Sequence, residues 1–300
     1  MKRNIGILLA ILAAIFYSIN SPLSKILLDY MPSTLMAGFL YLGAGICMLF
    51  IFFFRKIIKK EKKELKLTKC ELPYTIMMII LDILAPIFLL LGLKSISASN
   101  ASLLNNFEIV STALIAFIIF KEKISLRLWV GIIFVTFSCF LLSIESLDNF
   151  NNFNFSIGSI FVLIACICWG VENNCTKMLS SKDPLQIVLL KGIFSGCGSL
   201  IIGFIIGERL NNLWSVFAVL GVGVVAYGLS IFVYVYAQRL IGAARTSAYY
   251  AISPFIGSFL SFLIFHQLPN YFYLIALLLM MIGAWLCIDD KPLFKKSNQI

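Results

Sequence analysis

Long apolar runs, each about the length of one bilayer crossing, occupy most of this 300-residue chain. A hydrocarbon core about 30 Å thick is spanned by about 20 residues of α-helix. The runs are too long and too continuous for the alternating strands of a membrane β-barrel, and helices satisfy their own backbone hydrogen bonds in lipid. The sequence therefore predicts an all-α polytopic membrane protein with ten transmembrane helices, at residues 5–28, 35–54, 72–93, 98–120, 126–144, 157–179, 184–206, 213–239, 243–265 and 271–288.

The composition excludes an ordinary water-soluble domain. Hydrophobic residues make up 61% of the chain and charged residues only 13%, whereas soluble domains average about 25% charged residues. The net charge of +10 does not indicate nucleic-acid binding, because the basic residues lie between the apolar runs. The expected partners are a lipid bilayer and a small-molecule substrate, with no nucleic acid, and the oligomeric state is left open.

The distribution of basic residues predicts the orientation. With the N-terminus in the cytoplasm, twenty Lys and Arg residues fall on the cytoplasmic side, whereas Lys94 and Arg209 fall on the other side, and Lys25 and Lys191 lie within spans. This asymmetry follows the positive-inside rule and predicts that both termini lie in the cytoplasm. The membrane expected for the protein is the plasma membrane. The basic run at 55–69 is expected to be a solvated loop that sets the topology, with anionic-lipid binding as the alternative.

The two halves of the sequence resemble each other. Residues 17–32 align with 169–184 at a constant offset of 152, and residues 94–120 align with 239–265 at an offset of 145. These matches predict two five-helix repeats, at residues 1–145 and 156–290. Because five is odd, the second repeat must cross the membrane in the opposite direction. Inverted repeats of this kind are typical of secondary transporters.

The motifs within these repeats resemble the drug/metabolite transporter superfamily, specifically proteins with two EamA-type repeats. Trp169-Gly170 followed by Lys177 matches the first helix of such a repeat, and the segments 107–110 (Phe-Glu-Ile-Val) and 252–255 (Ile-Ser-Pro-Phe) match the fourth. The first copy has isoleucine in place of the proline, and the second has lost the terminal glutamate. The resemblance implies a ten-helix secondary transporter, often an exporter of amino acids or other small metabolites.

Two acidic residues near the predicted bilayer midplane are candidate binding groups. An ionisable group within the membrane costs about 2.5–3.5 kcal/mol, so it needs a partner, a cavity or a function. Counted from the hairpin near Ser97, Asp82 and Glu108 lie within about one turn of the same depth, and Asn105 adds a polar group next to Glu108. We expect the two carboxylates to bind protons or a cargo amine together. The alternative is a structural carboxylate that is hydrogen-bonded to a neighbouring helix.

Glu172 and Lys191 form a second candidate pair, because each lies seven positions from the turn between the sixth and seventh predicted helices. Equal depth on adjacent helices permits an ion pair, which is either a structural or gating salt bridge or a cargo contact. Asn173 follows Glu172, and three successive polar residues cannot all face one direction on a helix. Charges of both signs within the membrane would suit a zwitterion such as an amino acid.

Aromatic and polar residues of the first and fourth helices of each repeat complete the predicted substrate-binding set. Tyr249 and Tyr250 precede Pro254, which frees a backbone carbonyl and is tolerated mainly beside a cavity. Their rings could meet a cationic or aromatic cargo, and aromatic packing between helices is the alternative. Asn20 and Trp169 are the corresponding candidates on the two first helices.

The glycines of the later spans are expected to serve helix packing rather than binding. Gly192 and Gly196 have the spacing at which small residues allow two membrane helices to approach closely. Gly221 and Gly223 continue this pattern on the next helix.

These observations predict a secondary transporter, expected to be an exporter, that moves a small polar metabolite by alternating access around a midplane cavity. The sequence contains no nucleotide-binding GxxxxGK[ST] loop, so the driving gradient would be that of the cargo or of protons. No cofactor or metal is expected, since no CxxC pair or His/Cys cluster occurs. A receptor or scaffold on the same fold is the alternative. An enzyme is not expected because no catalytic constellation is evident.

Overall fold

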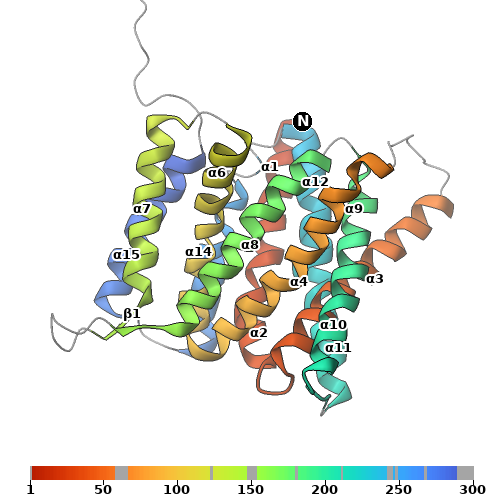
Figure 1. The fold of residues 1–300 in the computed structure, drawn as a ribbon. Coiled ribbons are helices and arrows are strands. Elements are labelled where there is room, and N and C mark those ends of the chain that lie inside the picture. Colours follow the sequence, from red (N-terminus) through yellow and green to blue (C-terminus); the bar gives the residue numbers. More distant parts are fainter. Residues whose placement is uncertain are drawn as a thin grey trace, which may run out of the picture.

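The computed structural model describes residues 2–57, 67–121, 124–146, 154–179, 182–210, 212–241, 246, 249–266 and 269–288, most of which are helical (Figure 1). The helices of the first half are α1 (Lys2–Ser18), α2 (Asn20–Leu27), α3 (Ser33–Ile57), η1 (Lys69–Glu71), α4 (Leu72–Ser95), α5 (Ala98–Leu104), α6 (Phe107–Phe120) and α7 (Leu126–Ser143). Those of the second half are α8 (Ile157–Leu179), α9 (Pro184–Leu190), η2 (Lys191–Ser195), α10 (Gly196–Ile205), α11 (Leu213–Val222), η3 (Gly223–Leu229), α12 (Ser230–Ile241), α14 (Ser253–Phe265) and α15 (Tyr271–Ile288).

Eight helical segments within the described residues are long and apolar enough to cross a bilayer, and they coincide with the first eight predicted spans. The last two predicted spans correspond to shorter apolar helical segments, Ser253–Phe265 in α14 and Tyr271–Cys287 in α15. The helix of the ninth span is short because the chain turns at residues 251–252, next to Pro254, which has no N–H to donate. The prediction of a helical polytopic membrane protein is confirmed.

A short β-hairpin joins the two halves and departs from the all-α expectation. β1 (Ile144–Ser146) pairs antiparallel with β2 (Asn154–Phe155), with Ile144 opposite Phe155. The first strand continues directly from the end of α7, where the backbone becomes extended at Ile144. The hairpin connects the lower ends of α7 and α8 in the view of Figure 1.

The outer surface of the bundle is far more apolar than that of a soluble protein, and several polar side chains are buried inside. Large apolar side chains such as Ile205, Phe53 and Phe259 are exposed on the outside, whereas Asp82 and Glu172 are buried. Such a surface suits contact with lipid chains, and the buried polar groups need partners inside the bundle.

The close packing of α3 depends on glycines. In Figure 1, α3, α10 and α11 lie at one end of the bundle and α7 with α15 at the other. A Cβ atom added to Gly192 would lie 2.3 Å from the backbone nitrogen of Gly45 on α3. One added to Gly223 would lie 2.1 Å from the carbonyl oxygen of Leu40. The expectation that Gly192 serves helix packing is therefore supported by its position.

The regular helix is interrupted within three of the predicted spans. Ile19 separates α1 from α2, and residues 105–106 separate α5 from α6. A turn at residues 251–252 precedes α14. Lys25, which the sequence places inside the first span, donates hydrogen bonds to the backbone oxygens of Leu93 and Ile96 at the end of α4, the latter at 2.9 Å. A cation at a helix C-terminus satisfies free carbonyls and the helix dipole, which accounts for this lysine within the span.

Candidate functional site

The centre of the bundle holds a buried charged cluster of Asp82, Glu172 and Lys191, contributed by α4, α8 and the start of η2. The Lys191 ammonium contacts a carboxylate oxygen of Glu172 and lies 3.4 Å from an oxygen of Asp82. All three residues are buried. The structure thus brings Glu172 and Lys191 together, as their equal depth suggested, and adds Asp82 to them.

Two hydroxyl groups donate further hydrogen bonds to this cluster, although one oxygen of Asp82 has only the ion pair with Lys191. Tyr41 of α3 donates a hydrogen bond of 2.8 Å to Asp82, and Thr176 donates one to Glu172. A buried ion pair is stable only when its remaining hydrogen-bonding capacity is satisfied, because desolvation otherwise cancels the attraction. The sequence analysis missed Tyr41 and Thr176, since a tyrosine or threonine within an apolar run does not stand out as an ion partner.

Glu108 does not form the predicted pair with Asp82. Its carboxylate accepts a hydrogen bond of 2.6 Å from the side-chain amide of Asn173, and the same amide lies 3.4 Å from the Thr112 hydroxyl. The expectation failed because equal depth says nothing of the direction in which a side chain leaves its helix. Asp82 points to α3 and η2, and Glu108 points to α8.

The polar run on α8 divides its side chains between these two groups. Glu172 contacts Lys191 and Asn173 contacts Glu108, while Asn174 donates hydrogen bonds to backbone oxygens of Thr112 on α6 and Gly170 on its own helix. The run therefore links the charged cluster to Glu108. This agrees with the prediction that the three residues do not share one direction.

A chain of five tyrosine rings packs inside the bundle. We call it the tyrosine cluster, and it consists of Tyr17, Tyr41, Tyr227, Tyr234 and Tyr250. Ring centroids in this cluster are 4.9 to 6.0 Å apart. Glu108 lies close enough to Tyr17, Tyr227 and Tyr250 to act on them electrostatically.

The remaining predicted residues are divided between polar contacts and the apolar core. The amide of Asn20 donates a hydrogen bond of 3.1 Å to the Tyr227 hydroxyl. Tyr250 packs against Tyr17 and Tyr234. Tyr249 packs instead with the small apolar cluster of Ala10, Ala237 and Ile241, and Trp169 is buried in the main apolar core.

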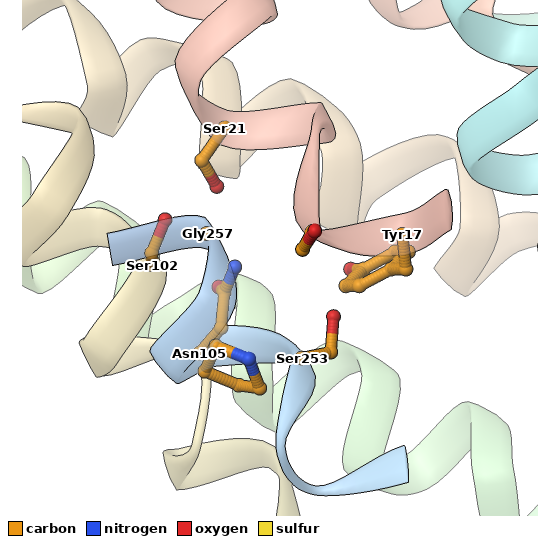
Figure 2. A pocket seen from close by; sticks show the side chains of 8 residues that line it. Tyr17, Ser21, Ser102, Asn105, Ser253 and Gly257 are labelled. Carbon is orange, nitrogen blue, oxygen red and sulfur yellow. The ribbon is translucent and has the colours of Figure 1, made fainter. Parts of the chain in front are cut away.

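A small pocket lies where the three helix turns meet (Figure 2). It is lined by Tyr17, Ser18, Ser21, Ser102, Asn105, Ser253, Pro254 and Gly257. The hydroxyl oxygens of Ser102 and Ser253 are buried there without a hydrogen-bond partner. Of these residues the sequence analysis named only Asn105 as a ligand, because single serines in a membrane helix are common and carry no signal of their own.

Comparison with known proteins places this architecture in a family. A model of the EamA-like transporter family matches residues 4–144 and again residues 156–288. An uncharacterized transporter of Methanothermobacter thermautotrophicus is 29% identical over 283 residues, covering 89% of this chain and 81% of the relative. The uncharacterized transporter YyaM of Bacillus subtilis is 22% identical over 260 residues, covering 83% of this chain and 82% of that protein.

A solved crystal structure has the same fold. It superposes with a TM-score of 0.67 at 14% sequence identity, and the match covers 94% of each chain. The family match extends over both halves of the sequence and agrees with the helical membrane architecture described above. The chain belongs to the EamA-like transporter family and is a membrane transporter, not an enzyme.

Proposed function

We propose that this transporter is a secondary carrier that moves a small polar metabolite by alternating access between two inverted five-helix repeats, residues 1–145 and 156–290. Contacts between the halves support the repeat because they occur in matching pairs. α4 packs against α8 as α12 packs against α1, and α6 packs against α8 as α14 packs against α1. Equivalent helices also pair with each other, α7 with α15 and α3 with α10.

Individual residues follow the same correspondence. Lys121 and His266, 145 positions apart, are the two non-glycine residues with positive φ in the described chain, and both end the fourth predicted span of a half. Asp82 and Tyr227 are also 145 positions apart. Both lie at the contact with the other half, Asp82 facing the Lys191–Glu172 pair and Tyr227 accepting a hydrogen bond from Asn20.

The observation that carries the proposal is that the buried and partly buried polar groups of the interior lie between the halves. Asp82 and Glu108 belong to the first half, whereas Glu172, Asn173 and Lys191 belong to the second. Relative movement of the two repeats would therefore change the surroundings of every one of these groups. A site placed in this way is alternately exposed on the two sides of the membrane when inverted repeats rock against each other.

Two further contacts between the halves lie at helix ends, where the gates of an alternating-access transporter would close. Glu208, in the loop before α11, accepts hydrogen bonds of 3.3 and 2.9 Å from the backbone N–H groups of Thr34 and Leu35 at the start of α3. Lys182, just before α9, forms an ion pair of 3.0 Å with Glu71, just before α4. Each contact joins the loop before the third span of one half to the start of the second span of the other.

We further propose that the protein lies in the plasma membrane with both termini in the cytoplasm, and that it exports its cargo. The exposed thiol of Cys70 adjoins the basic run that defines this orientation. In a variant that keeps Cys70 as its one cysteine, a membrane-impermeant maleimide added to intact cells is expected to leave the thiol unlabelled. Labelling should occur once the membrane is permeabilised, and full labelling of intact cells would reverse the orientation.

Flux through reconstituted vesicles tests the transport function. Wild-type protein is expected to move at least one compound of a panel of amino acids, polyamines and quaternary ammonium compounds, in response to the compound's own gradient or a pH gradient. If Glu108 carries the coupling proton, Glu108→Gln should abolish the dependence of flux on the pH gradient. Unchanged dependence would exclude that role. A receptor on the same fold would bind a compound without moving it.

A further inference from the structure

We propose that the cargo is a small organic cation bearing a hydroxyl group, an amino alcohol or its quaternary ammonium form, bound at Glu108 beside the tyrosine cluster. The proposal rests on the transport function above and names the substrate class of that same site. It combines three observations, which are the charge balance of the centre, the stacked rings of the tyrosine cluster and the pocket that Tyr17 and Asn105 line one turn before Glu108.

The charge balance favours a cation. Asp82, Glu172 and Glu108 provide three carboxylates, and Lys191 provides one ammonium, which contacts Glu172 and Asp82. Glu108 instead accepts a hydrogen bond from the neutral amide of Asn173, and no lysine or arginine of the described chain forms an ion pair with it. A carboxylate in a low-dielectric interior without a paired cation attracts a cationic ligand.

The tyrosines supply the second element of a cation site. Tyr17 and Asn105 line the same pocket, and Glu108 lies about one helical turn after Asn105. The ring of Tyr17 lies 5.9 Å from that of Tyr250. Tyr17 is only partly buried and lines the pocket described below. The face of an aromatic ring attracts ammonium and quaternary ammonium groups, the more strongly when water is excluded.

The adjoining pocket supplies the contact for the hydroxyl group. Tyr17 borders the pocket, whose lining residues carry no charge. Figure 2 shows Ser102, Asn105 and Ser253 among the side chains that line it. Ser102 and Ser253 are 3% and 1% exposed, and neither hydroxyl oxygen has a hydrogen-bond partner. A buried polar group without a partner costs free energy, which a ligand hydroxyl in this pocket would recover.

The same arrangement disfavours an amino acid, the cargo that charges of both signs suggested from the sequence. A zwitterion would bring a fourth carboxylate to the centre. The ammonium that could pair with it, that of Lys191, is already held by Glu172 and Asp82. The ligand's own ammonium would pair with Glu108, but its carboxylate would find no cation of this cluster left to pair with and would be repelled by the other carboxylates.

Calorimetric titration of the purified full-length protein tests the charge requirement. The probes are choline, ethanolamine, glycine betaine, in which a carboxylate replaces the hydroxymethyl group of choline, and 3,3-dimethylbutan-1-ol, in which carbon replaces its nitrogen. The better of the two cations is expected to bind at least about tenfold more tightly than either of the other probes. Equal or tighter binding of glycine betaine or the neutral alcohol, or no binding of either cation, would overturn the proposal.

Variants of the site test the residues. Glu108→Gln should weaken binding of the better cation at least about tenfold and leave the neutral alcohol unaffected. Asp29→Asn, which removes an exposed carboxylate beyond α2, should change neither and serves as the matched control. Ser102→Ala with Ser253→Ala should weaken choline binding about three- to tenfold without affecting tetramethylammonium. A folded Glu108→Gln protein that binds the cations as tightly as wild type would contradict the assignment, and the serine variants test it independently.

Flux measurements separate this proposal from the transport function. Binding of a cation that does not cross the vesicle membrane would leave the site assignment standing and reject transport of that cation. Flux of an amino acid by protein that binds neither cation would leave the transport function standing and reject the cation site.

Discussion

Replacing Lys191 by methionine is expected to lower the free energy of unfolding by about 3–5 kcal/mol, a large part of the total stability of a typical protein. The ammonium of Lys191 is the group that lies between the buried carboxylates of Asp82 and Glu172. Without it, two like charges remain in a site from which water is excluded. The measurement is the yield of folded protein and its thermal unfolding in detergent.

A triple variant provides the matched control. Lys191→Met combined with Asp82→Asn and Glu172→Gln removes the charges while retaining similar side-chain volumes, and it should recover most of the lost stability because no unpaired charge remains. A single Lys191→Met variant as stable as wild type would contradict the account. So would a triple variant no more stable than the single one.

Replacing Gly223 by alanine is expected to destabilise the bundle by at least about 2–3 kcal/mol, because the new methyl group would overlap a neighbouring helix. The added Cβ atom would lie 2.1 Å from the carbonyl oxygen of Leu40, which is backbone and cannot rotate away. α3 would have to move outward along the whole seam that it forms with α10, α11 and η3. Thermal unfolding in detergent measures the loss.

Gly221, two positions earlier, provides the control. A Cβ atom added there meets nothing within 4 Å, so Gly221→Ala should be neutral or stabilising by up to about 1 kcal/mol, the difference in helix propensity. The sequence treats the two glycines alike, and the structure distinguishes them. Equal effects of the two substitutions would show that the close approach of α3 to Gly223 does not exist.

Hydropathy gave the depth of each residue within the membrane but not the direction in which its side chain points. Depth was enough to place Glu172 beside Lys191, because consecutive antiparallel helices are neighbours. It was not enough for Asp82 and Glu108, which leave their helices toward different partners. The rotation of a helix is fixed by its packing, and a span that is hydrophobic on all sides carries little information about it.

Features that depend on contacts between distant parts of the chain could not be predicted from the sequence. The contact between Asn20 and Tyr227 joins residues separated by 207 positions. The pocket combines serines from helices of both halves, each inconspicuous by itself. The turns at Ile19 and at residues 105–106 lie within apolar runs that read as continuous helices. Such features arise from the meeting of helices, so local patterns do not reveal them.

The central claim is that the two halves rock against each other and open one face as the other closes. Pulsed electron–electron double resonance in reconstituted vesicles measures the distance between spin labels on the two halves. One doubly labelled variant carries spin labels at Asp29 and Arg209, on the face of the Glu208 contact. A second carries them at Cys70 and Met178, near the Lys182 contact, and other native cysteines are replaced in both.

When a transported compound is added, or the pH is changed, the two distances are expected to shift in opposite directions, one lengthening as the other shortens. Distances that remain constant under every condition, or that lengthen together, would contradict alternating access.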